Sequence, residues 1–311
     1  CIRDRFLLSA NMVVCHRLTP DLQFRWKDWS GKAIWEIICA GMWTSLNNLG
    51  NVLNSGLDLL ITNIMLNATV LGEISVAKNL ATITGVVILK ISAAFRPRQL
   101  ILFSKGDTEQ MVKLFRTTMK LTGTFCGLLI TGFYVCGTDF LSLWLPGQNI
   151  GFIFRASMIV LLSDIAVGVV HPLYYTYTLT KKLKVPCMIT ILMGTTNVVS
   201  MYLLIRHTSL GVYAVLLTTL VINLVHFVDA PLYAAHCLHV PFRTFYPVIF
   251  RHLSMIALGM GAAHLLRNAL PAATSWVGLA GKCAGTGVVL LPVLLLIMFR
   301  VSELKNLKLR R

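Results

Sequence analysis

The sequence predicts an all-α membrane protein, a polytopic bundle of about eight transmembrane helices, from its composition and from its recurring apolar runs. Of its 311 residues 56% are hydrophobic and only 13% are charged, and the mean hydropathy is +0.73. A soluble domain carries about 25% charged residues, so this composition indicates a protein that spans a lipid bilayer. The net charge of +16 does not indicate a nucleic-acid partner, because the basic residues lie mostly between apolar runs rather than clustered on one soluble face.

Eight apolar runs are long enough to cross a bilayer core, which needs about 20 residues of helix. In chain order they cover residues 36–66, 72–95, 118–137, 152–178, 185–205, 210–235, 246–266 and 276–299. The first two exceed the minimum, so we expect them to tilt, kink or project into water, with Gly50 and Gly56 as flex points. Residues 6–15 are too short to span and are interpreted as the end of a preceding helix. Residues 138–147 are interpreted as an interfacial outer segment anchored by Trp144.

The basic residues predict the orientation of these spans. One set of alternating loops and tails contains 20 Lys and Arg residues, and the other set contains 4. Because basic loops stay on the cytoplasmic side, both ends of the eight-helix block are predicted to be cytoplasmic. Every loop is short, so no extramembrane segment is expected to form a catalytic domain. The eight cysteines form no CxxC pair and indicate neither a metal site nor a disulfide framework.

An amide-rich stripe interrupts the first apolar run. Asn47, Asn51, Asn54 and Asp58 fall on one face of a helix. A carboxylate that faces lipid is costly, so this face is expected to turn toward protein or toward a water-filled cavity. Two interpretations stay open: the amides hold neighbouring helices together, or they line a hydrated path.

The next run contributes two lysines. If residue 69 is the tip of the helical hairpin, Asp58 lies 11 residues before it and Lys78 lies 9 residues after it. At 1.5 Å per residue the two differ in depth by only about 3 Å, so the spacing allows an Asp58–Lys78 ion pair. Lys90 lies at the depth of Asn47 and is interpreted either as a functional cation or as a side chain that reaches back to the inner interface.

Two further acids lie inside apolar runs. Asp164 precedes Pro172, and Asp229 precedes Pro231. Either acid could belong to an ion or proton pathway, or it could satisfy backbone groups that the nearby proline releases. Asn197 and Asn223, which also lie within apolar runs, are interpreted as packing residues.

Four segments together resemble the oligosaccharide flippases in order and spacing. They are GMWTSLNNLGNVLNSGLDLLI from residue 41, LGEISVAKNLATI from residue 71, AAFRPRQLILFSKGD from residue 93 and FLSLWLPG from residue 140. These transporters are the polysaccharide-export branch of a superfamily that also contains the multidrug-and-toxin extruders and the lipid II flippases. The resemblance extends from about residue 17 to about residue 240.

The resemblance implies an inverted-V transporter with two six-helix lobes, often followed by two further helices. Residues 31–238 would form the second lobe, and residues 239–311 two additional helices and a basic cytoplasmic tail. Residues 1–30 would be the end of a preceding helix and a cytoplasmic linker. Because relatives begin with several more spans, the resemblance implies that most of the first lobe is absent from this sequence. It also implies the cytoplasmic (inner) membrane of a bacterium.

The resemblance implies that the substrate is a short glycan on a polyprenyl pyrophosphate, moved to the outer leaflet for surface polysaccharides such as O-antigen. Polysaccharide assembly proteins would then be partners. Lys78, Lys90 and Arg98 are the candidate hosts for the pyrophosphate, because its charge requires cations. The asparagine stripe could supply amide partners for the glycan hydroxyls.

No cofactor is implied, although transport in relatives is thought to use a proton or sodium gradient. The candidate residues for such coupling are the three membrane acids, Asp58, Asp164 and Asp229. An alternative is a multidrug or cation antiporter of the same superfamily, which should have an acidic cavity lined by aromatic residues. An integral-membrane enzyme that polymerises or ligates glycans would require a large outer loop with paired catalytic residues, and the short outer loops disfavour it.

Overall fold

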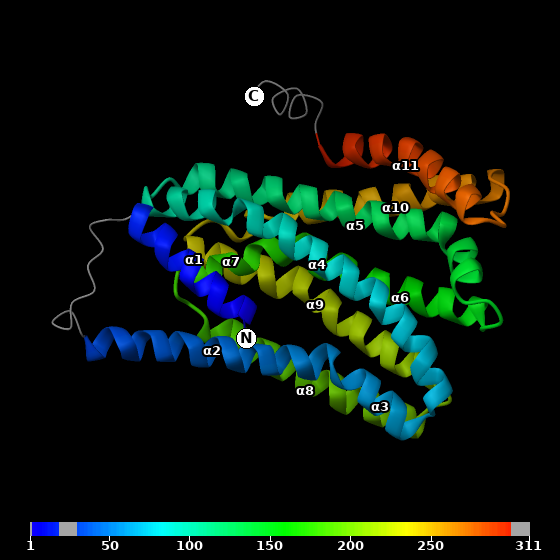
Figure 1. The fold of residues 1–311 in the computed structure, drawn as a ribbon, viewed down its shortest axis with the longest axis horizontal. Helices are drawn as coiled ribbons and strands as arrows, with labels where there is room; N and C mark the ends of the chain where they lie inside the picture. The colour runs from blue at the N-terminus through cyan, green and yellow to red at the C-terminus, as the bar shows by residue number, and fades with distance from the viewer. Residues whose placement is uncertain (1, 19–29, 300–311) are drawn as a thin grey trace. The chain divides into compact units, whose positions relative to one another are not determined.

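The computed structural model describes residues 2–18 and 30–299, and every regular element within them is a helix (Figure 1). In chain order these are α1 (Ile2–Leu18), α2 (Gly31–Ser55), α3 (Leu57–Met65), α4 (Ala68–Ser104), α5 (Thr108–Trp144), α6 (Ile150–Val170), η2 (His171–Tyr174), α7 (Tyr175–Leu179), α8 (Lys184–His207), α9 (Val212–Leu238), η3 (Phe242–Thr244), α10 (Tyr246–Ala269) and α11 (Trp276–Met298). The predicted all-α class is confirmed. Residues 19–29 of the predicted segment 1–30, and residues 300–311 of the predicted segment 239–311 with its basic tail, lie outside the described residues.

Seven helical segments in the described ranges are long and apolar enough to cross a membrane. They are Ala68–Ser104, Thr108–Trp144, Ile150–Leu179, Lys184–His207, Val212–Leu238, Phe242–Ala269 and Trp276–Met298. They match the second to eighth predicted spans, so the chain is a polytopic membrane bundle. The first predicted span is instead divided into α2 and α3 at Gly56, and α3 has only 9 residues.

The chain forms two compact units, Cys1–Met42 and Trp43–Arg311. The first unit contains α1 and the beginning of α2. All contacts described below lie within the second unit.

Several helices extend past their predicted spans or break within them. α4 and α5 have 37 residues each, and α5 continues through Trp144, so residues 138–144 are not a separate interfacial segment. The predicted span at 152–178 is interrupted after Val170 by the 3-10 turn η2, because Pro172 has no backbone N–H to continue the α-helical pattern.

Helix α5 forms the centre of the second unit and packs against α4, α6, α10 and α11. Fully buried side chains on and around it include Phe115, Met119, Ile130 and Met255. Figure 1 shows α10 and α11 lying alongside α5, so these two helices belong to the same compact unit as the preceding ones.

Polar contacts attach the α10–α11 hairpin to both ends of α5. Near one end, Arg116 donates to the carbonyl oxygen of Thr244 from Nε at 2.9 Å and from Nη2 at 2.6 Å. Near the other end, Lys282 Nζ lies 2.8 Å from Asp139 Oδ2, which also accepts from the backbone N–H of Ala273 at 2.9 Å. The hairpin is therefore held to α5 by directional contacts as well as by apolar packing.

Glycines allow α2 and α8 to approach each other closely. A Cβ atom on Gly194 would lie 2.7 Å from the carbonyl oxygen of Gly50, and one on Gly50 would lie 3.0 Å from Ile191 N. Such backbone contact requires small residues at the crossing. Gly56 marks the helix break, as the sequence predicts for a flex point, whereas Gly50 lies within α2 at this crossing.

Candidate functional site

The second unit contains a cavity of about 540 Å³ bounded by α2, α4, α6, η2, α7, α8 and α9. Apart from Asn223, its lining residues on α4, α8 and α9 lie in the halves of these helices that adjoin the loops at 105–107, 180–183 and 239–245. These loops belong to the basic set, so the cavity occupies the half of the bundle on that side. Its volume is typical of a site for a small ligand or for part of a larger one.

The cavity lining is mostly polar and aromatic. Its polar members are Thr44, Asn47, Asn51, Asn54, Ser92, Arg96, Asp164, His171, Thr178, Thr190, Asn223, His226 and Asp229. Its aromatic members, apart from the histidines, are Trp43, Tyr174, Tyr175, Tyr177 and Tyr233. The fixed charges of this lining are therefore one guanidinium and two carboxylates.

The predicted site residues do not all meet at this cavity. Asn47, Asn51 and Asn54 line it, because the stripe on α2 faces α4, α6 and α9. Lys90 and Arg98 do not line it, and both are exposed side chains on α4. The three candidate hosts for the pyrophosphate, Lys78, Lys90 and Arg98, therefore lie outside the lining of this cavity.

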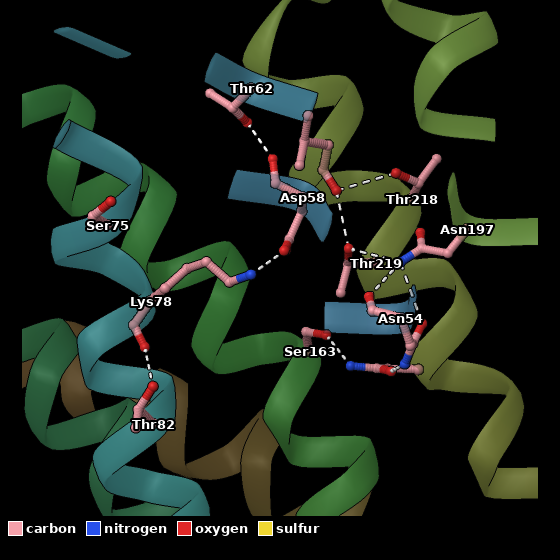
Figure 2. Close-up of polar contacts among 12 residues, drawn as sticks. Asn54, Asp58, Thr62, Ser75, Lys78, Thr82, Ser163, Asn197, Thr218 and Thr219 are labelled. Carbon is pink, nitrogen blue, oxygen red and sulfur yellow. Dashed lines mark hydrogen bonds and ion pairs between the residues drawn. The ribbon is translucent and has the colours of Figure 1, made fainter. Parts of the chain in front are cut away.

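The other predicted acids divide between two places. Asp164 and Asp229 both line the cavity. Asp58 is only 4% exposed and lies outside the lining, where its carboxylate forms an ion pair with Lys78. Figure 2 shows this pair joining α3 to α4, as the depths of the two residues predict.

Asn54 connects the cavity to a chain of buried amides (Figure 2). Asn197 Nδ2 donates to the backbone oxygen of Asn54 at 2.6 Å, to its Oδ1 at 3.2 Å and to Thr219 Oγ1 at 3.3 Å. Asn54 Nδ2 donates to Asn223 Oδ1 at 3.2 Å, and Asn223 Nδ2 donates to Ser163 Oγ at 2.7 Å. The helix-contact interpretation thus applies to Asn54, whose partners are the two asparagines expected to be packing residues. Asn47 and Asn51 line the cavity one to two turns away from Asn54. The stripe therefore contacts neighbouring helices at one end and lines the cavity at the other.

Asp164 lines the cavity and also interacts with Lys78. It lies within electrostatic range of Lys78, and its Oδ2 atom is buried with no hydrogen-bond partner in the described part of the chain. A buried acceptor without a partner is costly, so this atom is available to a ligand, a water molecule or a proton.

Arg96 is a cavity residue that is not among the predicted site residues. Its guanidinium lies 5.3 Å from the centre of the Tyr175 ring, in a cation–π arrangement. The predicted span ends at residue 95, which leaves Arg96 in the following loop, yet α4 continues to Ser104. The apolar residues 100–103 were the available signal that the helix continues past Pro97.

Two histidines, His171 and His226, also belong to the polar lining of the cavity. His226 Nδ1 lies 3.1 Å from Asp229 Oδ1, and His171 Nδ1 lies 3.1 Å from Ser92 Oγ. The Tyr174 ring packs edge-on against both imidazoles, with centroids 5.7 Å from His171 and 6.0 Å from His226. The cavity therefore offers hydrogen-bond donors, acceptors and ring faces, a set suited to binding a polar organic ligand.

Comparison with known proteins supports the membrane assignment. No protein-family model and no solved structure matches the chain. The chain is similar to the uncharacterized membrane protein EpsK of Bacillus subtilis (strain 168), with 28% identity over 207 residues. The match covers 65% of this chain and 40% of that protein, so the chain spans less than half the length of this curated relative. With seven apolar helices long enough to span a bilayer, the chain is an integral membrane protein.

Proposed function

We propose that this chain belongs to a transporter, rather than an enzyme, that moves polyprenyl-pyrophosphate-linked oligosaccharides across the cytoplasmic membrane for surface polysaccharide synthesis. The observation that carries the proposal is the polar, aromatic-lined cavity of about 540 Å³ inside a membrane-spanning bundle. Polar side chains inside a membrane-spanning bundle cost free energy unless they have partners, so a polar lining indicates that the cavity binds a polar ligand. The resemblance of four segments to oligosaccharide flippases supports the same substrate.

The cavity lining fits a glycan. Asn47 and Asn51 present amide groups, which donate to and accept from sugar hydroxyls. Tyrosines such as Tyr174 and Tyr175 present ring faces, against which the apolar face of a sugar can pack. In this proposal the lipid tail stays in the bilayer and only the glycan enters the cavity.

The remaining predicted residues have roles outside the cavity. The exposed cations Lys90 and Arg98 on α4 would meet the pyrophosphate at the membrane surface. Lys78 would act through its ion pair with Asp58 rather than through substrate contact. Polysaccharide assembly proteins would supply the substrate and remove it, and the basic loops would face the cytoplasm.

In this proposal, the acidic residues within the membrane couple transport to an ion gradient. A proton or sodium gradient would act through Asp58, Asp164 or Asp229. Asp164 is the best placed of the three, because it lines the cavity and has a buried oxygen without a partner among the described residues.

A matched pair of substitutions tests the proposal in a strain whose own gene carries each change. Asn51→Leu replaces a cavity amide, and Val52→Leu changes a side chain that is 52% exposed and outside the cavity lining. We expect Asn51→Leu to reduce surface polysaccharide and to raise the pool of lipid-linked oligosaccharide, and Val52→Leu to leave both unchanged. Equal amounts of surface polysaccharide in the two strains, at equal protein levels, would contradict the proposal.

One observation favours a second candidate, a multidrug or cation antiporter. The cavity has two carboxylates against one guanidinium, and five of its residues are Trp or Tyr. Such a lining also suits an aromatic cation. Susceptibility to ethidium separates the candidates: Asp164→Asn raises it if the chain exports cationic drugs and leaves it unchanged if the chain moves glycans.

A further inference from the structure

Arg96 is a cavity cation without a counter-ion in the described part of the chain. Its side chain is half-buried, and its Nε atom is buried without a hydrogen-bond partner among the described residues. Its guanidinium lies 5.3 Å from the centre of the Tyr175 ring and within electrostatic range of His171. The two cavity acids are engaged elsewhere: Asp229 contacts His226, and Asp164 lies within range of Lys78. A guanidinium held in a membrane-spanning bundle is costly unless an anion shares its site.

The neighbouring cations of α4 point away from this site. At about 100° of rotation per residue, Arg98 and Lys90 are separated from Arg96 by about 160° and about 120° around the helix, respectively. Accordingly, Arg96 lines the cavity while Arg98 and Lys90 are exposed and outside the lining. One helix therefore presents two separate cationic faces, one to the cavity and one to its exterior.

The part of the cavity lining that comes from α6 presents an acceptor. Asp164 on α6 has a buried Oδ2 without a partner in the described ranges, and Asn47 and Asn51 on α2 add amides. A ligand that binds both Arg96 and Asp164 carries an anionic group for the guanidinium and hydroxyl donors for the carboxyl oxygen. It must also have a compact ring to pack on tyrosine within about 540 Å³.

We propose that this cavity binds a sugar bearing a carboxylate, a uronic acid, with Arg96 as the host of its carboxylate. This inference rests on the proposed function and names the class of sugar that enters the cavity. A carboxylate matches the planar donor fork of Arg, and the ring hydroxyls donate to Asp164.

The pyrophosphate of the carrier lipid is the competing source of an anion. Its tail remains in the bilayer, while the cavity lies among helices α2, α4, α6, α8 and α9, so we expect the phosphates to meet the exposed face of α4 instead. The geometry therefore gives the two anionic groups of one substrate to different faces of the same helix.

The test is equilibrium binding of D-glucuronate, D-glucose and inorganic pyrophosphate to the purified protein in lipid nanodiscs. We expect glucuronate to bind more tightly than glucose. Arg96→Gln should weaken glucuronate binding about tenfold or more, and Arg96→Lys should retain part of it. The matched control is Lys105→Gln, which removes an exposed charge at the end of α4 and should change glucuronate binding less than twofold.

Any one of four results would overturn the inference that the cavity binds a uronic acid. These results are no glucuronate binding by the unsubstituted protein, equal binding of glucose and glucuronate, equal loss in the Lys105→Gln control, or pyrophosphate binding that depends on Arg96. A thermal unfolding curve for each variant shows that it is folded, and Arg96→Lys preserves the charge if the glutamine variant unfolds.

The outcome is separable from that of the proposed function. If glucuronate binding depends on Arg96 while the Asn51→Leu strain exports polysaccharide normally, the sugar site stands and the flippase proposal fails. If export fails in the Asn51→Leu strain while glucuronate binds no better than glucose, the flippase proposal stands and the uronic acid assignment fails.

Discussion

Lys78 on α4 forms an ion pair with Asp58 on α3, inside a hairpin whose two helices would otherwise expose both charges to an apolar environment. The side chains are 19% and 5% exposed, respectively. Since Asp164 also lies within electrostatic range of Lys78, one ammonium group interacts with two carboxyl groups that come from different helices.

Removing either partner of this pair should destabilise the protein. A buried charge without its partner costs about 3–5 kcal/mol. We expect Lys78→Met to be the more damaging change, because it leaves two carboxylates without their cation, whereas Asp58→Leu leaves Lys78 beside Asp164. The Asp58→Leu/Lys78→Met double variant should be more stable than Lys78→Met alone. The free energy of unfolding in mixed micelles measures this, and a double variant whose loss equals the sum of the single losses would contradict it.

The contact between Gly50 and Gly194 should not tolerate a methyl group. The new Cβ of Gly194→Ala would lie 2.7 Å from the oxygen of Gly50, so α2 and α8 must separate, at a cost of about 1–3 kcal/mol. Gly281→Ala in α11 is the matched control, because no atom lies within 4 Å of its added Cβ. There alanine should be neutral or should stabilise the helix by up to about 1 kcal/mol. Thermal unfolding of both variants is the measurement, and equal melting temperatures would refute the predicted crossing.

The side-chain amide of Asn197 should contribute more to the stability of the protein than the amide of an exposed asparagine. Asn197→Ala leaves the backbone oxygen of Asn54 without its donor at 2.6 Å, and the expected loss is about 1–3 kcal/mol. Asn79→Ala, on the exposed side of α4, should cost less than about 0.5 kcal/mol. Chemical unfolding of the two variants side by side compares these losses, and a greater loss for Asn79→Ala would be incompatible with the network.

The orientation of the bundle can be tested by labelling. Ser104→Cys places an exposed thiol at the end of α4, just before α5, and Gln148→Cys places one in the loop that follows α5. A membrane-impermeant maleimide should label Gln148→Cys in intact cells and Ser104→Cys only after permeabilisation, because the basic loops are expected to be cytoplasmic. The unsubstituted protein reports the background from native cysteines such as the exposed Cys283. The reverse labelling pattern would invert the topology.

Helix positions follow from the sequence because a bilayer forces backbone groups to bond within each span, so apolar length alone locates the helices. The Asp58–Lys78 pair was predictable for a similar reason, since helix rise converts residue number into depth. The direction in which a side chain points around its helix was not predictable. Arg96 faces the cavity while Arg98 does not, and this depends on how α4 rotates against α6 and α9. Likewise, sequence alone could not show that Asn54 binds Asn197 while Asn47 lines the cavity, because both have the same helical phase.

The attachment of α10 and α11 to α5 at both ends has a mechanical consequence. Sliding or tilting of this hairpin would break the Arg116–Thr244 contacts at one end and the Asp139–Lys282 pair at the other. The helices α2 and α8 meet at glycine backbones, and one amide, Asn197 Nδ2, joins them by donating to the backbone oxygen of Asn54. The three fastened helices are therefore expected to move together, as one rigid frame.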